Sequence, residues 1–253
     1  MASYQVPTET RLPMPHQEPP RRSIRTLKDL VVRIVWLAVG LALVFIPQLP
    51  MSAVLIMKKE HHPASTPVFI ALLVLMIVLY GGAIWAVRRL IRQYTSQPLV
   101  RRWEARDWLY LGVGYLVMLG TKLLLIPFYT GTSGEKMTQN DAAIQALLKN
   151  GNQMVIMIVL MTVFAAPIIE EMVFRGYVMT AFYTKNPIWP ILISGILFGA
   201  VHRNDNLAGT LIYVVLGMIL AYVYRRTGNM GVNIGLHFLN NAPMLLIGLQ
   251  MLK

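Results

Sequence analysis

The sequence predicts an all-α protein, a polytopic bundle of seven or eight transmembrane helices. Hydrophobic residues make up 56% of the 253 residues and charged residues only 13%, and the mean hydropathy is +0.55. Soluble domains carry about 25% charged residues, so this balance indicates an integral membrane protein. The formal net charge is +12, and the Lys and Arg lie mainly at the ends of apolar runs. We attribute this charge to membrane topology and expect no nucleic-acid partner.

The chain divides into a polar tail and an apolar remainder. Residues 1–26 are rich in Pro and Arg and predict a disordered cytoplasmic tail, whereas residues 27–253 predict a single transmembrane domain. Basic residues directly before the first apolar run place the N-terminus in the cytoplasm. Six arginines in residues 88–106 mark a second cytoplasmic segment, two crossings later. The expected location is therefore the cell membrane, with the lipid bilayer as a partner along the whole domain.

Seven apolar segments follow the tail. They cover about residues 30–57, 67–87, 108–129, 153–183, 189–202, 207–224 and 232–251. The first contains Pro47 and Pro50, so it is either one kinked helix or two helices, which gives seven or eight crossings. Residues 138–149 predict a short helix at the outer membrane surface, capped by Asn140 or Asp141.

Two adjacent carboxylates and an arginine interrupt the fourth apolar segment, in the pattern Glu170-Glu171-x-x-x-Arg175. An ionisable group at bilayer depth costs several kcal/mol, so it is by default a candidate functional residue. Glu171 and Arg175 are spaced i,i+4 and share a helix face, which predicts an ion pair. Glu170 is rotated from Glu171 by about 100° and has no local counter-charge. We therefore expect Glu171 to support the helix and Glu170 to be free for chemistry.

Two histidines and an amide lie on other apolar segments. His202 ends the fifth segment, and His237 and Asn241 are spaced i,i+4 on one face of the seventh. A carboxylate in an apolar pocket can act as general base to a water molecule that a neighbouring imidazole helps to hold. A second imidazole and an amide NH2 can donate hydrogen bonds to the oxygen that becomes negative when water attacks a peptide carbonyl. Each residue alone would fit an interhelical hydrogen bond, but together they predict a water-activating hydrolase.

The series Glu-Glu-x-x-x-Arg, Phe-x-x-x-His and His-x-x-x-Asn on successive apolar segments resembles the CPBP intramembrane proteases, a family of CAAX proteases and bacteriocin-processing (Abi) proteins. The resemblance covers about residues 153–245. It implies an intramembrane endopeptidase that cleaves a membrane-associated peptide or protein in a bacterium, in bacteriocin processing, self-immunity or the regulation of membrane signalling. The implied roles are Glu170 as general base, His202 helping to bind the water, His237 and Asn241 as the oxyanion site, and Glu171 with Arg175 as the supporting ion pair.

Three questions stay open at this point. Glu170, His202 and His237 could supply three ligands to Zn2+. Because the His-Glu-x-x-His pattern is absent, water activation without a metal or other cofactor is favoured. A non-catalytic immunity or scaffold protein could bind a peptide or sensor partner through the same residues. Simple alternation of crossings also puts His202 and His237 near opposite membrane surfaces, whereas a single site requires similar depth.

Overall fold

The computed structural model describes residues 24–134, 137–182, 188–202, 204 and 206–252. In this part of the chain we find helices and short connections and no strand, so the predicted all-α fold is confirmed. The predicted tail, residues 1–26, lies almost entirely outside the described residues.

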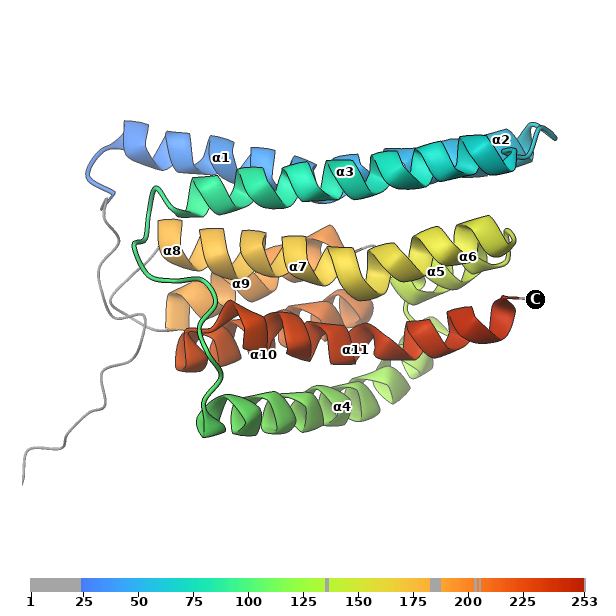
Figure 1. The fold of residues 1–253 in the computed structure, drawn as a ribbon. Helices are drawn as coiled ribbons and strands as arrows, with labels where there is room; N and C mark the ends of the chain where they lie inside the picture. The colour runs from blue at the N-terminus through green and yellow to red at the C-terminus, as the bar shows by residue number, and fades with distance from the viewer. Residues whose placement is uncertain (1–23, 135–136, 183–187, 203, 205, 253) are drawn as a thin grey trace, which may run out of the picture.

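The helices alternate in direction along one bundle (Figure 1). Their bounds are α1 (Leu27–Phe45), α2 (Leu49–Lys59), α3 (Thr66–Ile91), α4 (Ala105–Ser133), α5 (Gln139–Leu148), α6 (Asn152–Val159), α7 (Ala166–Glu171), α8 (Met179–Ala181), α9 (Ile188–Val201), α10 (Leu207–Thr227) and α11 (Met230–Met251). The short 3-10 helix η1 (Ile46–Gln48) joins α1 to α2. The π-helical segments η2 (Leu160–Ala165) and η3 (Met172–Val178) join α6, α7 and α8.

Six helical runs among the described residues are long and apolar enough to cross a membrane. They are Leu27–Lys59, Thr66–Ile91, Ala105–Gly131, Asn152–Ala181, Leu207–Thr227 and Met230–Met251, and α9 is a shorter apolar helix. The first run is one continuous helix that contains Pro47 and Pro50, rather than two crossings. A proline removes a backbone donor and crowds the preceding turn, which accounts for the 3-10 turn at this point.

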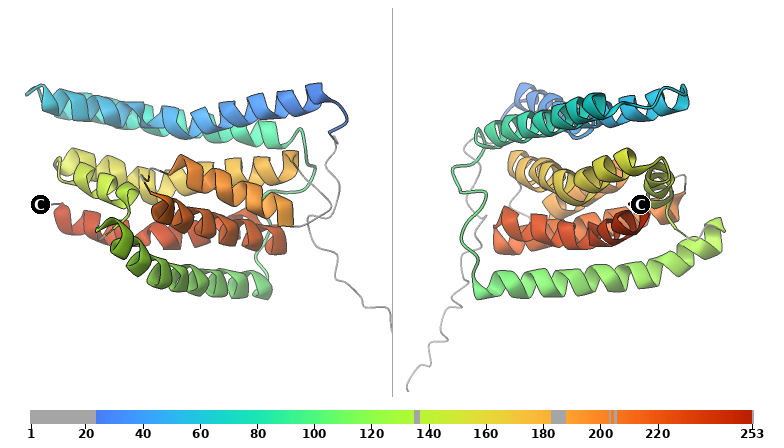
Figure 2. Two further views of the ribbon diagram at one scale, coloured as in Figure 1. Left: turned by 180° about the vertical axis from the view of Figure 1, so that it is seen from behind. Right: turned by 45° about the vertical axis from the view of Figure 1, so that its right-hand side comes forward.

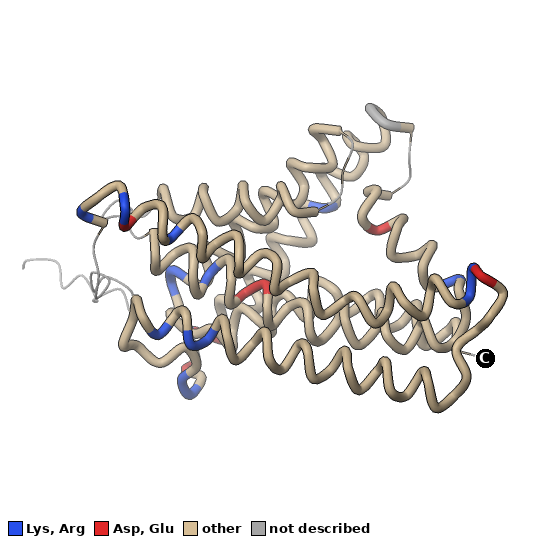
Figure 3. Tube along the Cα trace, turned by 90° about the horizontal axis from the view of Figure 1, so that it is seen from above, with Lys and Arg blue, Asp and Glu red and all other residues tan. Residues whose placement is uncertain are grey.

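One end of the bundle, which we call the arginine-rich end, is defined by two sets of contacts. Arg33 near the start of the first helix donates a hydrogen bond to the carbonyl of Ala181 at the end of α8. Arg101, in the loop before α4, donates to the carbonyl of Thr227 at the end of α10 over 3.0 Å. Most of the described Lys and Arg gather here (Figure 3): Arg25, Lys28, Arg33, Arg88, Arg89, Arg92, Arg101, Arg102, Arg106, Arg225 and Arg226.

The other end, which we call the opposite end, carries fewer basic residues. Lys58 Nζ, at the end of α2, donates to the carbonyl of Asn150 over 2.6 Å. Gln153, at the start of α6, donates to the carbonyl of Ala64 before α3 over 2.9 Å. The Lys and Arg described at this end are Lys58, Lys59 and Lys149, and Lys122 lies on the cavity wall in the half of α4 nearer to it. The charge difference between the two ends is therefore large.

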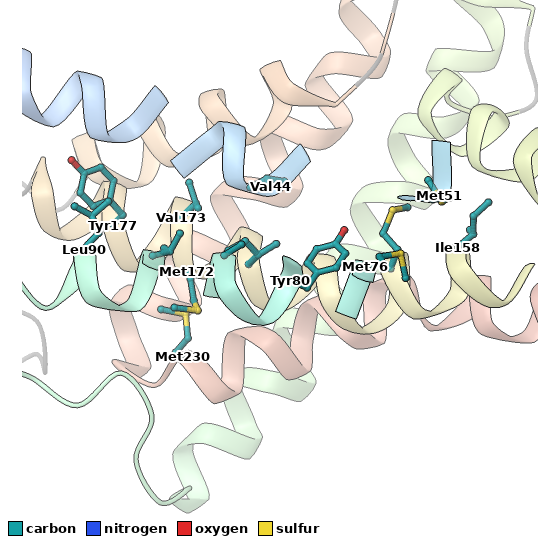
Figure 4. Close-up of a cluster of buried hydrophobic side chains, with 14 of the residues drawn as sticks. Val44, Met51, Met76, Tyr80, Leu90, Ile158, Met172, Val173, Tyr177 and Met230 are labelled. Atoms are coloured by element: carbon teal, nitrogen blue, oxygen red, sulfur yellow. The ribbon is translucent and has the colours of Figure 1, made fainter. Parts of the chain in front are cut away.

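The helices lie in layers that both ribbon views separate. The kinked first helix and α3 form one outer layer, α6–α8 and α11 run through the middle, and α4 lies on the far side (Figures 1 and 2). A cluster of buried side chains fills the space between the first two layers, and it includes Val44, Met76, Tyr80, Val173 and Met230 (Figure 4). On α4, by contrast, the outward-facing leucines are 67–78% exposed, as expected for a helix that faces lipid: Leu116, Leu123 and Leu124.

Close packing of α9 on α10 sets the depth of His202. A Cβ on Gly199 would lie 2.9 Å from the backbone nitrogen of Val214, and one on Gly217 would lie 3.0 Å from Cα of Gly195. Small residues at such spacing let helices in membranes approach closely. At about 1.5 Å per residue, the 14 residues of α9 span about 21 Å, less than the hydrocarbon thickness of about 30 Å. His202 therefore ends inside the bundle, which removes the conflict with His237.

Candidate active site

The four residues selected from the sequence meet at one cavity inside the bundle. Glu170, His202, His237 and Asn241 all line this cavity, which has a volume of about 470 Å³. The rest of its wall comes from the kinked first helix, α4, α5 and α10. A space of this size within apolar helices is typical of a ligand or substrate site.

The predicted ion pair is present, on the side of the cavity nearer the arginine-rich end. Arg175 Nη1 is 2.9 Å from Glu171 Oε1, and both side chains are fully buried. Arg175 Nη2 donates to the carbonyl of Gly217 on α10 over 2.9 Å, and its guanidinium carbon lies 4.7 Å from the centroid of the Phe198 ring. The pair therefore ties α7 and η3 to both α9 and α10. This arrangement supports the structural role expected for Glu171.

Asn233 is a further hydrogen-bond donor to Glu171, a role that was not predicted from the sequence. Its Nδ2 donates to Glu171 Oε2 over 3.1 Å and to the carbonyl of Leu220 over 2.7 Å, and the side chain is fully buried. The signal was available, because Asn233, His237 and Asn241 are each four residues apart and so share one face of α11.

His237 connects the two glutamates. Its Nδ1 lies 2.8 Å from Glu171 Oε1, a distance that fits an N–H donated to this carboxylate. Its Nε2 then points to Glu170 Oε2, 3.8 Å away, which is longer than a hydrogen bond. Glu171 thus fixes the ring orientation, and Nε2 is the nitrogen that faces the cavity.

Glu170 differs from its neighbour in both burial and bonding. Its side chain is 14% exposed, whereas that of Glu171 is fully buried. Within the described part of the chain the Glu170 side chain makes no hydrogen bond. Its ion-pair contact is with His237. This geometry agrees with the prediction that Glu171 is paired and Glu170 is not.

The two π-helical segments flank the glutamates, and η2 contributes Met161 and Thr162 to the cavity wall. Such segments interrupt the α-helical hydrogen-bond ladder and occur frequently at functional sites. The carbonyl of Thr162, within η2, accepts a hydrogen bond from Asn241 Nδ2 over 2.9 Å. Asn240 Nδ2 in turn donates to Asn241 Oδ1 over 2.9 Å. Asn241 is thus held by two hydrogen bonds, and one proton of its NH2 group remains for a ligand.

His202 is held by the end of its own helix and by an aromatic neighbour. Its Nδ1 lies 2.7 Å from the carbonyl of Phe198, which can only accept, so Nδ1 carries the proton. In the neutral ring Nε2 is then an acceptor. The ring stacks on Tyr213 with centroids 4.4 Å apart and planes 13° apart. The structure therefore presents Nε2 of His202 as a group that can accept a hydrogen bond from water.

Tyr213 also links His202 to α5, which no sequence pattern indicated. Its hydroxyl lies 3.0 Å from Thr138 Oγ1, accepts from Asn140 Nδ2 over 3.3 Å and donates to Asp141 Oδ1 over 3.1 Å. The expected cap of this helix was wrong, because Thr138 caps α5 by accepting from the backbone N–H of Asp141. The side chains of Asn140 and Asp141 are thereby left to bind Tyr213.

Replacing Tyr213 by Phe should loosen α5 while keeping the ring stack on His202. Removing the hydroxyl takes away three hydrogen bonds, and each contributes about 1 kcal/mol, so we expect a loss of about 3 kcal/mol in the free energy of unfolding. Thermal unfolding in detergent measures this loss. Tyr222→Phe, an exposed position on the same helix, is the matched control. An unchanged Tm for Tyr213→Phe would show that the hydroxyl does not hold α5.

The residues weighed as zinc ligands do not gather as a metal centre. Among the described residues no group of three or more His, Cys, Asp or Glu side chains has an arrangement that could hold a metal ion. Nδ1 of His237 is engaged by Glu171 and Nδ1 of His202 by a backbone carbonyl, which leaves Nε2 of each ring free, as in many metal-binding histidines. The obstacle to a three-ligand zinc site is thus the spacing of Glu170, His202 and His237 in this conformation and not the chemistry of the three side chains.

Comparison with known proteins identifies the part of the chain that holds these residues. Residues 152–243 match the family described as type II CAAX prenyl endopeptidase Rce1-like. Over these residues, about a third of the chain, the sequence is similar to that family. The resemblance to the CPBP proteases is thereby confirmed, and the Rce1-like segment contains every candidate site residue from Glu170 to Asn241.

Curated relatives agree with this assignment. The chain is 29% identical over 126 residues to the "Putative membrane peptidase YdiL" of Bacillus subtilis, which covers 49% of each protein. It is 24% identical over 214 residues to the "UPF0177 protein YvdC" of Lactococcus lactis, which covers 84% of this chain and 78% of that protein. The "Uncharacterized protein YyaK" of Bacillus subtilis is 35% identical over 80 residues, 28% of this chain and 27% of that protein. The chain thus spans about half of YdiL and about a quarter of YyaK, and no solved structure matches it. The apolar helices and this similarity together indicate a multi-pass membrane protein.

Proposed function

We propose that the chain is an intramembrane endopeptidase in which Glu170 activates water to hydrolyse a peptide bond of a membrane-associated peptide or protein. The supporting observation is that an unpaired carboxylate, two oriented imidazoles and an amide line one cavity within apolar helices. Low polarity around such groups strengthens their action on charge that develops during a reaction.

Glu170 and His202 would act on the water. The carboxylate of Glu170 accepts one proton as the water oxygen bonds to the carbonyl carbon of the substrate. His202 Nε2 accepts a hydrogen bond from the other proton of this water and so directs the lone pair of the water oxygen at the carbonyl carbon. When the C–N bond breaks, Glu170 returns the proton to the departing amine. The products are a carboxylic acid and an amine, which become a carboxylate and an ammonium group when the acid proton passes to the amine. No covalent intermediate with the chain is required.

His237 and Asn241 would stabilise the oxyanion of the tetrahedral intermediate. Asn241 offers its remaining N–H, and its orientation is fixed in advance by Thr162 and Asn240. His237 offers Nε2 when the ring carries both protons, a state in which Nδ1–H is bound to Glu171. Donors fixed before the reaction need no reorganisation when charge develops, which is the source of their catalytic effect.

This mechanism uses only groups of the chain and no cofactor. The alternative weighed from the sequence, zinc held by Glu170, His202 and His237, would require these side chains to come closer together than they are in this conformation, and no step above passes through it. For the cellular role we propose bacteriocin processing, self-immunity or regulation of membrane signalling, in a bacterial cell membrane with the N-terminus in the cytoplasm.

Identification of new peptide termini tests the proposed activity. Proteoliposomes with the purified protein are mixed with detergent-extracted membrane proteins of the expression host, and new N-termini are identified by mass spectrometry. We expect N-termini that form with the wild type and are absent with Glu170→Gln. The same set of termini from both proteins would rule out hydrolysis by this site.

Replacing Asn241 by Leu should lower the rate of that cleavage. Loss of one oxyanion donor costs about 10²- to 10³-fold in kcat. The measurement is the rate of formation of one of these new termini, at saturating substrate. Asn150→Leu, on the connection between α5 and α6 and away from the cavity wall, is the matched control. A kcat within twofold of wild type would exclude Asn241 from the oxyanion site.

A further inference from the structure

The cavity lies toward one end of the bundle rather than at its centre. On α4, which starts at the arginine-rich end, the lining residues begin only at Met118 and continue to Ile126. On α11, which also starts there, they begin at His237 and continue to Ile247, close to the end of the helix. The run Asn152–Ala181 starts at the opposite end, and its deepest lining residue is Glu170. The cavity therefore extends from the middle of the bundle toward the opposite end.

Buried side chains close the cavity on the side of the arginine-rich end. Glu171, Arg175 and Asn233 fill this level with their hydrogen-bonded network, and each is fully buried. Phe174 and Leu236 are fully buried beside them. None of the basic residues that define the arginine-rich end lines the cavity. Water or a peptide has no route to Glu170 through this floor without breaking the network.

At the opposite end the wall is a short helix rather than a packed core. Residues of α5, among them Asn140, Ala143 and Gln145, line the cavity and are only half-buried. The start of this helix is hydrogen-bonded to the hydroxyl of Tyr213, and Leu148 at its end packs in the hydrophobic core. At this end of the bundle the cavity therefore approaches the surface at α5.

The distribution of Lys and Arg between the two ends indicates on which side of the membrane this end of the cavity lies. Loops rich in Lys and Arg stay in the cytoplasm, and the described basic residues are concentrated at the arginine-rich end (Figure 3). We infer that the cavity is entered from the non-cytoplasmic side, so that the substrate class is a peptide segment presented at the outer face of the membrane. The substrate part of this inference rests on the proposed peptidase function, but the side of entry does not.

Labelling of single cysteines tests the side of entry without an activity assay. The chain has no cysteine, so one introduced thiol reports on one position. Ala166→Cys and Ala143→Cys place a thiol on the cavity wall, from α7 and α5. Ser65→Cys marks the exposed loop at the opposite end, and Ser96→Cys the exposed loop at the arginine-rich end. Each variant is exposed to a charged, membrane-impermeant maleimide in intact cells and in inverted membrane vesicles.

We expect both cavity cysteines to react in intact cells together with Ser65→Cys, while Ser96→Cys reacts only in inverted vesicles. Reaction of the cavity cysteines with the same sidedness as Ser96→Cys would overturn the inference, as would reaction from neither side. Two cavity positions are used so that a fold defect in one variant leaves the other to decide. Because labelling needs no substrate, its outcome is independent of whether the protein is a peptidase.

Discussion

Replacement of Glu170 by Gln is expected to lower the rate of peptide hydrolysis by about 10²- to 10⁴-fold, the contribution typical of a positioned general base. Gln keeps the size and polarity of the side chain but cannot accept the proton of water. The free energy of unfolding should change little, because the Glu170 side chain makes no hydrogen bond among the described residues. Its ion-pair contact, to His237 Nε2, is 3.8 Å long. The measurement is kcat for a defined cleavage in proteoliposomes.

Two controls separate chemistry from folding in this comparison. Glu60→Gln removes an exposed carboxylate in the loop after α2 and should leave kcat unchanged. Thermal unfolding of Glu170→Gln should give a Tm close to that of the wild type. A variant with normal Tm and more than about a tenth of wild-type activity would be incompatible with the factor expected for a general base.

The same variant distinguishes the peptidase from a binding protein. A non-catalytic immunity or scaffold protein would use the cavity to hold a partner, and Gln can replace Glu as a hydrogen-bonding group. Cells that the wild type protects from a bacteriocin would then stay protected by Glu170→Gln. Loss of protection together with loss of new peptide termini would support hydrolysis as the cellular activity.

The division between Glu170 and Glu171 could be predicted from the sequence because it depends on local geometry. The i,i+4 spacing of Glu171 and Arg175 fixes their relative position on any helix, and the structure confirms this ion pair. The placement of His237 and Asn241 on one helix face follows from the same rule. Convergence of the helices could be inferred only from the joint pattern of polar residues, since no local rule sets the distance between Glu170 and His202.

What the sequence did not show depends on contacts between distant segments. The stack of His202 on Tyr213, and the link from Tyr213 to α5, bring together residues that are far apart in the chain. The double use of Glu171, by Arg175 and by His237, likewise requires α7 and α11 to pack side by side. The depth of His202 depends on how closely α9 packs on α10. Alternation of crossings, which treats every apolar segment as a full span, therefore placed the two histidines at different depths.

Replacing Arg175 by Met should destabilise the protein more than removing the hydroxyl of Tyr213. Glu171 is fully buried, and removing its partner leaves a buried carboxylate with only Asn233 and His237 as hydrogen-bond donors. Breaking a buried ion pair in this way costs about 3–5 kcal/mol. Met fills much of the same volume, so most of the loss should come from charge rather than from a cavity. Unfolding in a denaturing detergent titration measures the difference from the wild type.

The double variant Glu171→Gln with Arg175→Met tests whether charge is the cause. With both charges gone, no unpaired carboxylate remains, and we expect the double variant to regain much of the lost stability. Arg89→Met, an exposed arginine in the last turn of α3, is the matched control and should change stability by less than about 0.5 kcal/mol. If the double variant is as unstable as Arg175→Met alone, Arg175 acts through its contacts with the Gly217 carbonyl and the Phe198 ring instead. In that case Arg175 would stabilise the floor of the cavity by joining α9 and α10, and Glu171 would be held chiefly by Asn233 and His237.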